Sequence, residues 1–155
     1  MATATTSSAA AKLRTMRIRL LFAIGVLLYG TAAAADQASD LAAVMKFDRE
    51  IRQQLTDSRG RHDTLRVVLR AASYEETMKL VAAEEARDKE AAKAVDRMGV
   101  PAEPKDYATG LANAKRQAVG ALEARRDGNE RLASTREKAY AALAEGILAR
   151  LKDRR

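Results

Sequence analysis

Acidic residues between positions 75 and 90 are the side chains best suited to chemistry. They comprise Glu75, Glu76, Glu84, Glu85, Asp88 and Glu90. Such carboxylates could bind a hard cation or act as general acid and base. However, opposite charges follow one another at spacings of three or four residues, which pair them on one helix face. The pairs are Glu75 with Lys79, Glu85 with Lys89, and Glu90 with Lys93. The pattern therefore favours a solvated, ion-paired helix surface over a carboxylate active site.

His62 is the single histidine of the chain and could serve as a general base or a pH switch. No nucleophile stands beside it in the sequence, and the chain lacks cysteine, a glycine-rich phosphate loop and a Glu-x-x-His metal motif. We therefore place His62 in a polar loop, beside a helix N-cap at Asp63. The sequence predicts no catalytic, metal-binding or cofactor-binding residue, no cofactor and no enzymatic activity.

Basic side chains recur at three- and four-residue steps after position 58. Four of these residues form what we call the basic strip: Arg59, His62, Arg66 and Arg70. A strip of this kind on one helix face could contact an acidic protein or the headgroups of an anionic membrane. Because Asp57 and Asp63 lie among these residues and neutralise part of their field, ordinary surface charge is the alternative.

An export signal precedes these groups. Two arginines are followed by residues 20–30, which carry no charge, and then by small residues at 31–35. This order is typical of a secretory signal peptide, and its last alanines fit an A-x-A cleavage site. Since the apolar run is shorter than the roughly 20 residues of a membrane span, we predict cleavage after Ala35. An uncleaved inner-membrane anchor is the alternative, and it would also leave the body outside the cytoplasm.

Residues 36–155 are predicted to form one small helical domain, after an N-terminal extension and signal peptide in residues 1–35. Met16 is an alternative start. Four of the 28 basic residues and none of the 21 acidic residues precede Asp36, which reduces the net charge from +7 to +3. This modest charge argues against nucleic acid as the partner. We expect a periplasmic or secreted protein.

The hydrophobic core of this domain is expected to be thin. Residues 36–155 contain 24 Leu, Ile, Val, Met and Phe residues and no tryptophan, and the lack of cysteine excludes disulfides. Burying each such side chain contributes about 1.5–3 kcal/mol, while ordering each residue of the chain costs about 1.5 kcal/mol. Because these opposing contributions are of similar size, we expect marginal stability or self-association.

Helix-favouring residues dominate after Asp36, and no segment alternates apolar and polar residues as a strand does. The first expected helix runs from Ser39 or Asp40 to Asp57 and ends at the Ser-Arg-Gly sequence that follows. The second expected helix covers residues 63–98, with an aspartate as its N-cap. Its apolar stripe becomes irregular in the middle, so that two shorter helices are the alternative.

Capping signals locate the remaining helix ends. Ser73 and Glu76 match a capping box, which marks the place of that alternative break. Gly99 and Pro101 form the clearest boundary, because glycine can take a left-handed cap conformation and proline prevents continuation. Pro104 suits the first position of the next helix.

The Asp-Gly-Asn sequence at 127–129 is expected to end that helix, with Asn129 capping a last one. Otherwise residues 105–152 form a single long helix. The sequence thus predicts an all-α fold, either an antiparallel three- or four-helix bundle or an elongated helical hairpin.

These features favour an exported binding or scaffold protein of the cell envelope that acts through protein–protein contacts, including a chaperone-like role. The chain resembles small basic periplasmic helical chaperones in size, export signal and charge. Two alternatives are a carboxylate-based hydrolase of envelope polymers and a basic binder of membrane surfaces or nucleic acid. We expect a protein partner or self-association, with an anionic membrane surface as a further candidate.

Overall fold

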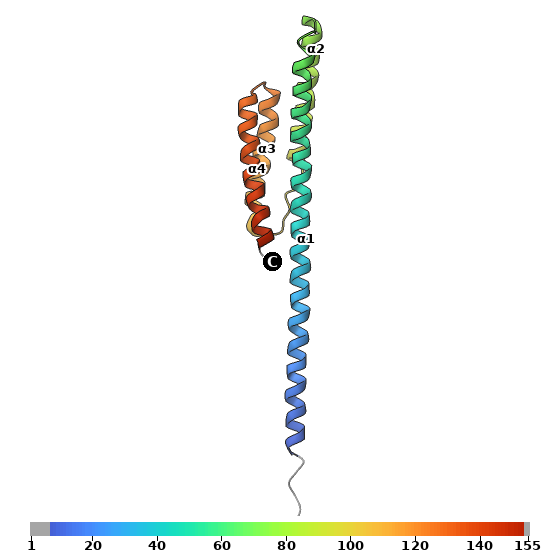
Figure 1. Cartoon of the computed structure of the whole chain (residues 1–155), viewed down its shortest axis with the longest axis vertical. Helices are drawn as coiled ribbons and strands as arrows, with labels where there is room; N and C mark the ends of the chain where they lie inside the picture. Colours follow the sequence, from blue (N-terminus) through green and yellow to red (C-terminus); the bar gives the residue numbers. More distant parts are fainter. Residues whose placement is uncertain (1–6, 154–155) are drawn as a thin grey trace, which may run out of the picture. The chain divides into compact units, whose positions relative to one another are not determined.

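The structure is a computed structural model that describes the backbone of residues 7–153 and the side chains of residues 36–153. Its helices are α1 Ser7–Val68, α2 Tyr74–Arg97, α3 Lys105–Arg126 and α4 Glu130–Asp153 (Figure 1). No strand occurs within this part of the chain, so the predicted all-α class is confirmed. The chain divides into two compact units, residues 1–39 and 40–155.

α1 begins at Ser7, well before the start predicted at position 39 or 40. Residues 31–38 contain neither glycine nor proline, so nothing in this stretch ends the helix. The signal segment and the cleavage site after Ala35 lie outside the residues whose side chains are described, and both stay predictions. Among residues 36–153, no helix is long and apolar enough to cross a membrane.

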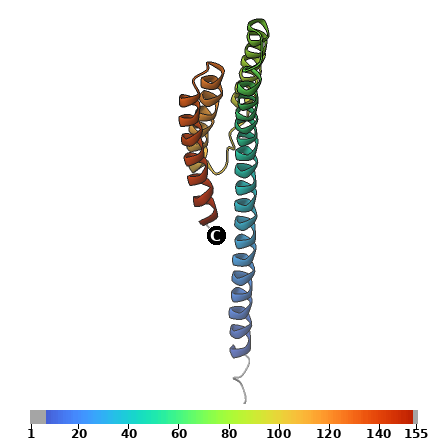
Figure 2. The same ribbon diagram turned by 45° about the horizontal axis from the view of Figure 1, so that its top comes forward.

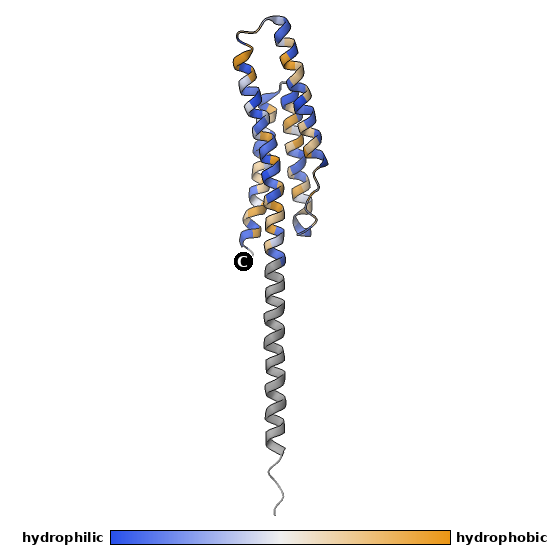
Figure 3. Cartoon of the chain, turned by 90° about the vertical axis from the view of Figure 1, so that its right-hand side faces the viewer, coloured by the Kyte–Doolittle hydropathy of each residue, from blue (hydrophilic) through white to orange (hydrophobic). Residues whose placement is uncertain are grey.

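Residues 40–155 form a four-helix bundle in which consecutive helices run antiparallel (Figures 2 and 3). α3 packs against both α2 and α4. Hydrogen bonds join α1 to α2 through Ser58 and Asp88, and to α4 through Asp48 and Tyr140. The bundle form of the prediction is therefore the correct one. The alternative of a single helix over residues 105–152 is wrong, because residues 127–129 interrupt it.

The apolar core is built from the inner faces of all four helices. Its larger side chains are Val44, Phe47, Ile51, Leu55, Val95, Leu111, Leu122, Tyr140, Ile147 and Leu151. Between α3 and α4 the core is mainly alanine, which brings the two helix axes close together. At Gly120, an added Cβ would lie 2.6 Å from Nη1 of Arg136. Leu132 and Leu143 on α4 lie outside this core and are 40% and 37% exposed.

α1 continues through residues 58–60, where the sequence predicted its end. Ser58 is buried, and its hydroxyl donates a 2.7 Å hydrogen bond to Oδ1 of Asp88 on α2. A glycine inside a helix costs about 1 kcal/mol, and contacts of this kind across the hairpin offset that cost. Asp63 consequently lies inside α1, and its predicted role as an N-cap is wrong.

The capping box at Ser73 marks the start of α2, five residues after α1 ends at Val68. The backbone amide of Glu76 donates to Oγ of Ser73 at 3.3 Å, and the amide of Ser73 donates to Oε2 of Glu76 at 2.9 Å. The hydrogen bonds that the backbone amide and the hydroxyl of Ser73 donate to the carboxylate of Glu76 hold the pKa of Glu76 below its ordinary value. The predicted break near Ser73 is therefore confirmed, but residues 63–68 continue α1 and do not form a separate shorter helix.

The boundary at Gly99 and Pro101 is confirmed, because α2 ends at Arg97. Its mechanism differs from the prediction, since Gly128 is the one glycine with positive φ among the described residues. The end of α2 is instead capped from α3, where Nζ of Lys115 donates to the carbonyls of Asp96 at 2.7 Å and Met98 at 3.2 Å. These bonds satisfy helix-end carbonyls that would otherwise lack a partner.

The turn between α3 and α4 follows the local sequence closely. Gly128 has a φ of 74°. Its amide donates to the carbonyl of Arg125 at 2.9 Å, while the amide of Asn129 donates to that of Ala124 at 2.8 Å, as in a Schellman motif. Oδ1 of Asn129 accepts from the amide of Leu132 and so caps α4. Pro104 is the N-cap of α3, one position before the predicted one.

Candidate functional site

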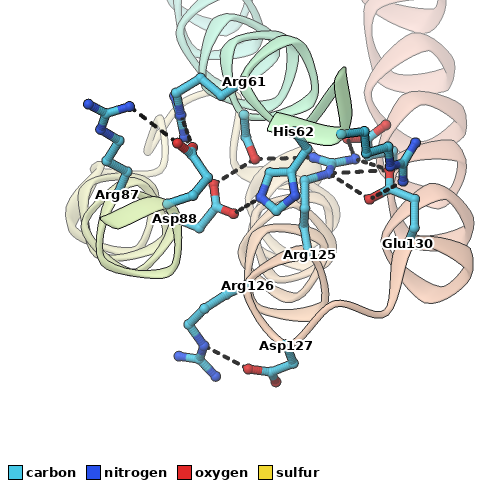
Figure 4. Close-up of polar contacts among 12 residues, drawn as sticks. Arg61, His62, Arg87, Asp88, Arg125, Arg126, Asp127 and Glu130 are labelled. Carbon is cyan, nitrogen blue, oxygen red and sulfur yellow. Dashed lines mark hydrogen bonds and ion pairs between the residues drawn. The ribbon is translucent and has the colours of Figure 1, made fainter. Parts of the chain in front are cut away.

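Each of the four helices contributes one polar side chain to a buried layer of the bundle (Figure 4). We call it the polar layer, and it consists of Ser58 on α1, Asp88 on α2, Arg125 on α3 and Glu137 on α4. The Ser58 hydroxyl donates to Asp88 and lies 3.4 Å from Nη1 of Arg125, which donates to it. Nη2 of Arg125 donates to Oε1 of Glu137 at 2.7 Å. Hydrogen bonds therefore connect all four helices.

Arg125 is the centre of the polar layer, and only 1% of it is exposed. Burial by itself would lower the pKa of Arg125, but its hydrogen bonds to Glu137 and Glu130 outweigh this effect and raise it. Arg59 on α1 also donates to Glu137, so two guanidinium groups share this carboxylate. Removing one member of a buried ion pair is costly, because the other charge stays buried without compensation.

Asp88 and Glu84 connect α2 to α1. Asp88 accepts from Nη2 of Arg61 at 3.0 Å, and Nε2 of His62 lies 2.6 Å from its other oxygen. Glu84, one helical turn earlier, accepts from Nε of Arg61 and, at 3.2 Å, from Nη1 of Arg87. The hairpin formed by α1 and α2 is thus held by a compact group of paired charges.

The group also contains a donor set that a transition metal such as zinc accepts. Ligand atoms of His62, Glu84 and Asp88 all lie within 4.8 Å of one another. Arg61, however, binds both carboxylates, so its guanidinium supplies the positive charge that a cation would bring. The geometry therefore favours helix pairing over metal binding.

The interpretation of the acidic cluster as a solvated surface is correct only in part. The ion pairs of Glu75 with Lys79 and of Glu90 with Lys93 are present, at 2.6 and 2.7 Å. The predicted pair of Glu85 with Lys89 is not formed among residues 36–153. Glu84 and Asp88 are instead buried, with exposed fractions of 5% and 0%. They face inward because they continue the buried stripe of α2, which the periodicity of their positions with Val95 could have shown.

His62 is part of α1 rather than a loop, so that prediction is wrong. Its side chain is 18% exposed and contacts Asp88 on the neighbouring helix. The helix passes through residues 58–60, and this places His62 on the face of α1 that packs against α2. Its partner could not be predicted from the sequence, because residue 88 lies in a different helix.

The other members of the basic strip lie at different depths. Arg59 pairs with Glu137, while Arg66 lies 3.6 Å from Glu130 and forms a second weak pair with Asp63. Arg70 is exposed, and no ion pair joins it to an acidic residue within positions 36–153. The strip therefore faces acidic side chains of the bundle near its start and solvent at its end. Binding of an anionic partner to it stays a prediction.

A second polar group joins α1 to α4. Tyr140 is buried, and its hydroxyl donates to Oδ1 of Asp48 at 2.7 Å. Nε of Arg52 donates to Oδ2 of the same carboxylate at 2.9 Å, and its guanidinium lies 5.8 Å from the centre of the tyrosine ring. Burial, together with the hydrogen bond to Asp48, raises the pKa of Tyr140 far above its ordinary value.

We expect the raised pKa of Tyr140 to make stability fall in alkaline solution. Above a pH of about 10 the unfolded chain releases this phenolic proton and the folded protein keeps it, so the free energy of unfolding decreases. Tyr140→Phe removes the hydrogen bond to Asp48. Near neutral pH it should therefore lower the free energy of unfolding by about 1 kcal/mol. This difference from the wild type should shrink as the pH rises further. Urea unfolding of both proteins across this pH range measures it, and parallel pH profiles would contradict the assignment.

α1 and α2 extend beyond the turn between α3 and α4 (Figures 1 and 3). Asp127 and Gly128 of this turn line a groove of about 400 Å³ together with His62 and Val81. Residues 67–80, which we call the hairpin end, therefore project past the other two helices.

A larger groove of about 770 Å³ lies along the α1–α2 hairpin, next to the hairpin end. We call it the side groove, and it is lined by Thr56, Asp57, Gly60, Arg61, Thr64, Leu65, Val68, Leu80, Ala83, Glu84 and Arg87. It shares Arg61 and Glu84 with the charged group that joins the two helices.

Comparison of the chain with protein-family models, curated proteins and solved structures found no match.

Proposed function

We propose that the protein is a non-enzymatic binding protein of the cell envelope that holds an apolar segment of another polypeptide in the side groove. The observation that carries the proposal is the composition of this groove. Leu65, Val68 and Leu80 supply apolar surface, and Arg61 and Arg87 supply hydrogen-bond donors beside it. Binding sites for polypeptide segments combine apolar contact with a few placed polar groups.

Small residues keep the side groove open. Gly60, Thr64 and Ala83 line it, and an added Cβ at Gly60 would meet nothing within 4 Å. An apolar stretch of a partly unfolded polypeptide is the occupant that suits such a groove, because its exposed side chains gain most from removal from water. Holding of this kind is chaperone-like. Its location in the envelope rests on the signal segment predicted in residues 20–35.

The charges around the groove favour binding over the alternative of a carboxylate-based hydrolase. An acid and a base in catalysis need environments that separate their pKa values. Here Arg61 donates to both Glu84 and Asp88, and Arg125 donates to Glu137. Arginine partners thus engage the buried carboxylate oxygens that proton transfer would require.

The test is whether the full chain suppresses aggregation of an unfolding client, such as lysozyme treated with a reducing agent, at near-stoichiometric ratios. Gly60→Gln adds a long polar side chain to the groove and should reduce suppression several-fold. Gly146→Gln is the matched control, since an added Cβ at this exposed position of α4 also meets nothing within 4 Å. Light scattering measures both. Absence of suppression by the wild type, or equal loss in both variants, would refute the proposal.

A further inference from the structure

Exposed apolar side chains gather at the hairpin end. Of the eight large apolar residues exposed within positions 36–153, five belong to residues 67–80. The most exposed are Tyr74, Val67 and Met78, at 83%, 66% and 54%. Tyr74 and Met78 are four residues apart and share one face of α2. A projecting patch of this kind marks an interaction with a protein or a membrane.

Basic side chains border this patch. Arg66 and Arg70 are four residues apart at the end of α1 and the turn that follows, and both are exposed. Arg70 has no ion pair among residues 36–153, and the contacts of Arg66 with Asp63 and Glu130 are long, at 3.5 and 3.6 Å. The acidic residues of the hairpin end bind other groups. Glu75 forms an ion pair with Lys79, and Glu76 accepts hydrogen bonds from Ser73 in the capping box. The guanidinium groups are therefore available to an anionic partner.

We propose that the hairpin end inserts its apolar side chains into the surface of an anionic phospholipid membrane. Arginine and tyrosine suit this boundary, because each combines an apolar body with a polar end that stays at the headgroups. A protruding end also fits a fluid surface, which adapts to its shape. A second copy meeting it end to end would bring Arg66 and Arg70 of both copies together, and like charges would repel.

This inference goes beyond the proposed function, because the most exposed side chains of the hairpin end differ from those of the side groove, although Val68 and Leu80 belong to both. Val67, Tyr74 and Met78 do not line the side groove. Loss of membrane insertion and loss of client holding can therefore be observed separately.

A tryptophan reporter tests insertion, since the chain has no tryptophan of its own. Tyr74→Trp in the full chain is mixed with vesicles of phosphatidylglycerol and phosphatidylcholine. We expect its emission to shift to shorter wavelength and to be quenched by lipids brominated on their acyl chains. Leu143→Trp is the matched control on α4, where the replaced side chain is 37% exposed, and it should show neither effect. The comparison holds even if residues 20–35 tether the chain to vesicles, because both variants carry them.

The charge requirement is tested in the Tyr74→Trp background. One basic residue near an anionic surface contributes about 1 kcal/mol, so Arg70→Gln should raise the lipid concentration for half of the spectral shift about fivefold. Arg150→Gln, an exposed arginine on α4, should leave it unchanged. The proposal is overturned by unchanged emission at position 74, by the same response at position 143, or by equal effects of the two arginine substitutions. A shift without vesicles that grows with protein concentration would overturn it in favour of a second copy.

Discussion

Arg125→Ala is expected to lower the free energy of unfolding by about 3–5 kcal/mol, the largest loss from any charged side chain in the bundle. The substitution leaves Glu137, which is 9% exposed, without its buried partner at 2.7 Å. It also removes the donor to Ser58 and breaks the connection between α3 and the polar layer. Urea unfolding of the full chain, followed by circular dichroism, measures the change.

Two comparisons separate the polar layer from ordinary surface charge. Arg126→Ala is the matched control. Among residues 36–153 this neighbouring arginine forms an ion pair only with Asp127, at the end of α3, and its removal should change stability little. Combining Arg125→Met with Glu137→Leu should cost much less than the sum of the single substitutions, since no buried charge is then left alone. If Arg125→Ala costs no more than Arg126→Ala, the polar layer does not stabilise the bundle.

Asp88→Asn is the second large effect, with an expected loss of about 1.5–3 kcal/mol. The amide keeps the shape of the side chain but removes the charge that Arg61 and His62 contact. It also replaces one acceptor oxygen with an NH₂ donor. The contact of that oxygen, either with Ser58 or with His62, must therefore change. Thermal or urea unfolding detects the loss.

Glu90→Gln is the control for Asp88→Asn. Glu90 lies on the same helix and also pairs with a basic residue, Lys93, but it is exposed. Its substitution should leave stability nearly unchanged, because exposed ion pairs contribute little. Equal effects at positions 88 and 90 would show that burial of Asp88 has no energetic consequence.

Helix ends set by local chemistry could be predicted from the sequence. Gly128 and Asn129 form the turn between α3 and α4 through bonds to residues at most five positions away. The capping box of Ser73 with Glu76 is equally local. The predicted end at residues 58–60 failed for the opposite reason. There Ser58 donates a hydrogen bond to Asp88, thirty positions along the chain. This contact helps to stabilise α1 where it passes through Gly60.

The polar layer could be predicted only in part, because charged residues in a helical sequence usually lie at the surface. Periodicity carried a signal, since Glu137 lies on the buried face of α4 that also carries Ala133, Tyr140 and Ala144. Asp88 occupies the equivalent place in the stripe of α2. Such spacing shows that a residue faces inward, but not which residue of another helix it meets. The pairing depends on the packing of all four helices.

The apolar hairpin end was also missed, for a related reason. Val68 shares an apolar helix face with Leu65 and Leu69 in the sequence, which favours a buried position, and Val67 directly precedes it. In the structure both valines lie at the end of α1, in the part of the hairpin that projects past α3 and α4, and Val67 and Val68 are 66% and 45% exposed. Burial at the end of a hairpin depends on the lengths of its neighbours as well as on its own pattern.

The central claim is that the four helices pack tightly up to the polar layer and that the hairpin end projects beyond it. Hydrogen exchange of the backbone amides tests this claim most directly, measured peptide by peptide on the full chain. Peptides from residues 44–58 and 111–125 should exchange slowest, and peptides from residues 67–80 should exchange much faster. Arg125→Ala should speed exchange around the polar layer first. Protection of residues 67–80 equal to that of residues 111–125 would contradict this structure of a packed body with an uncovered end.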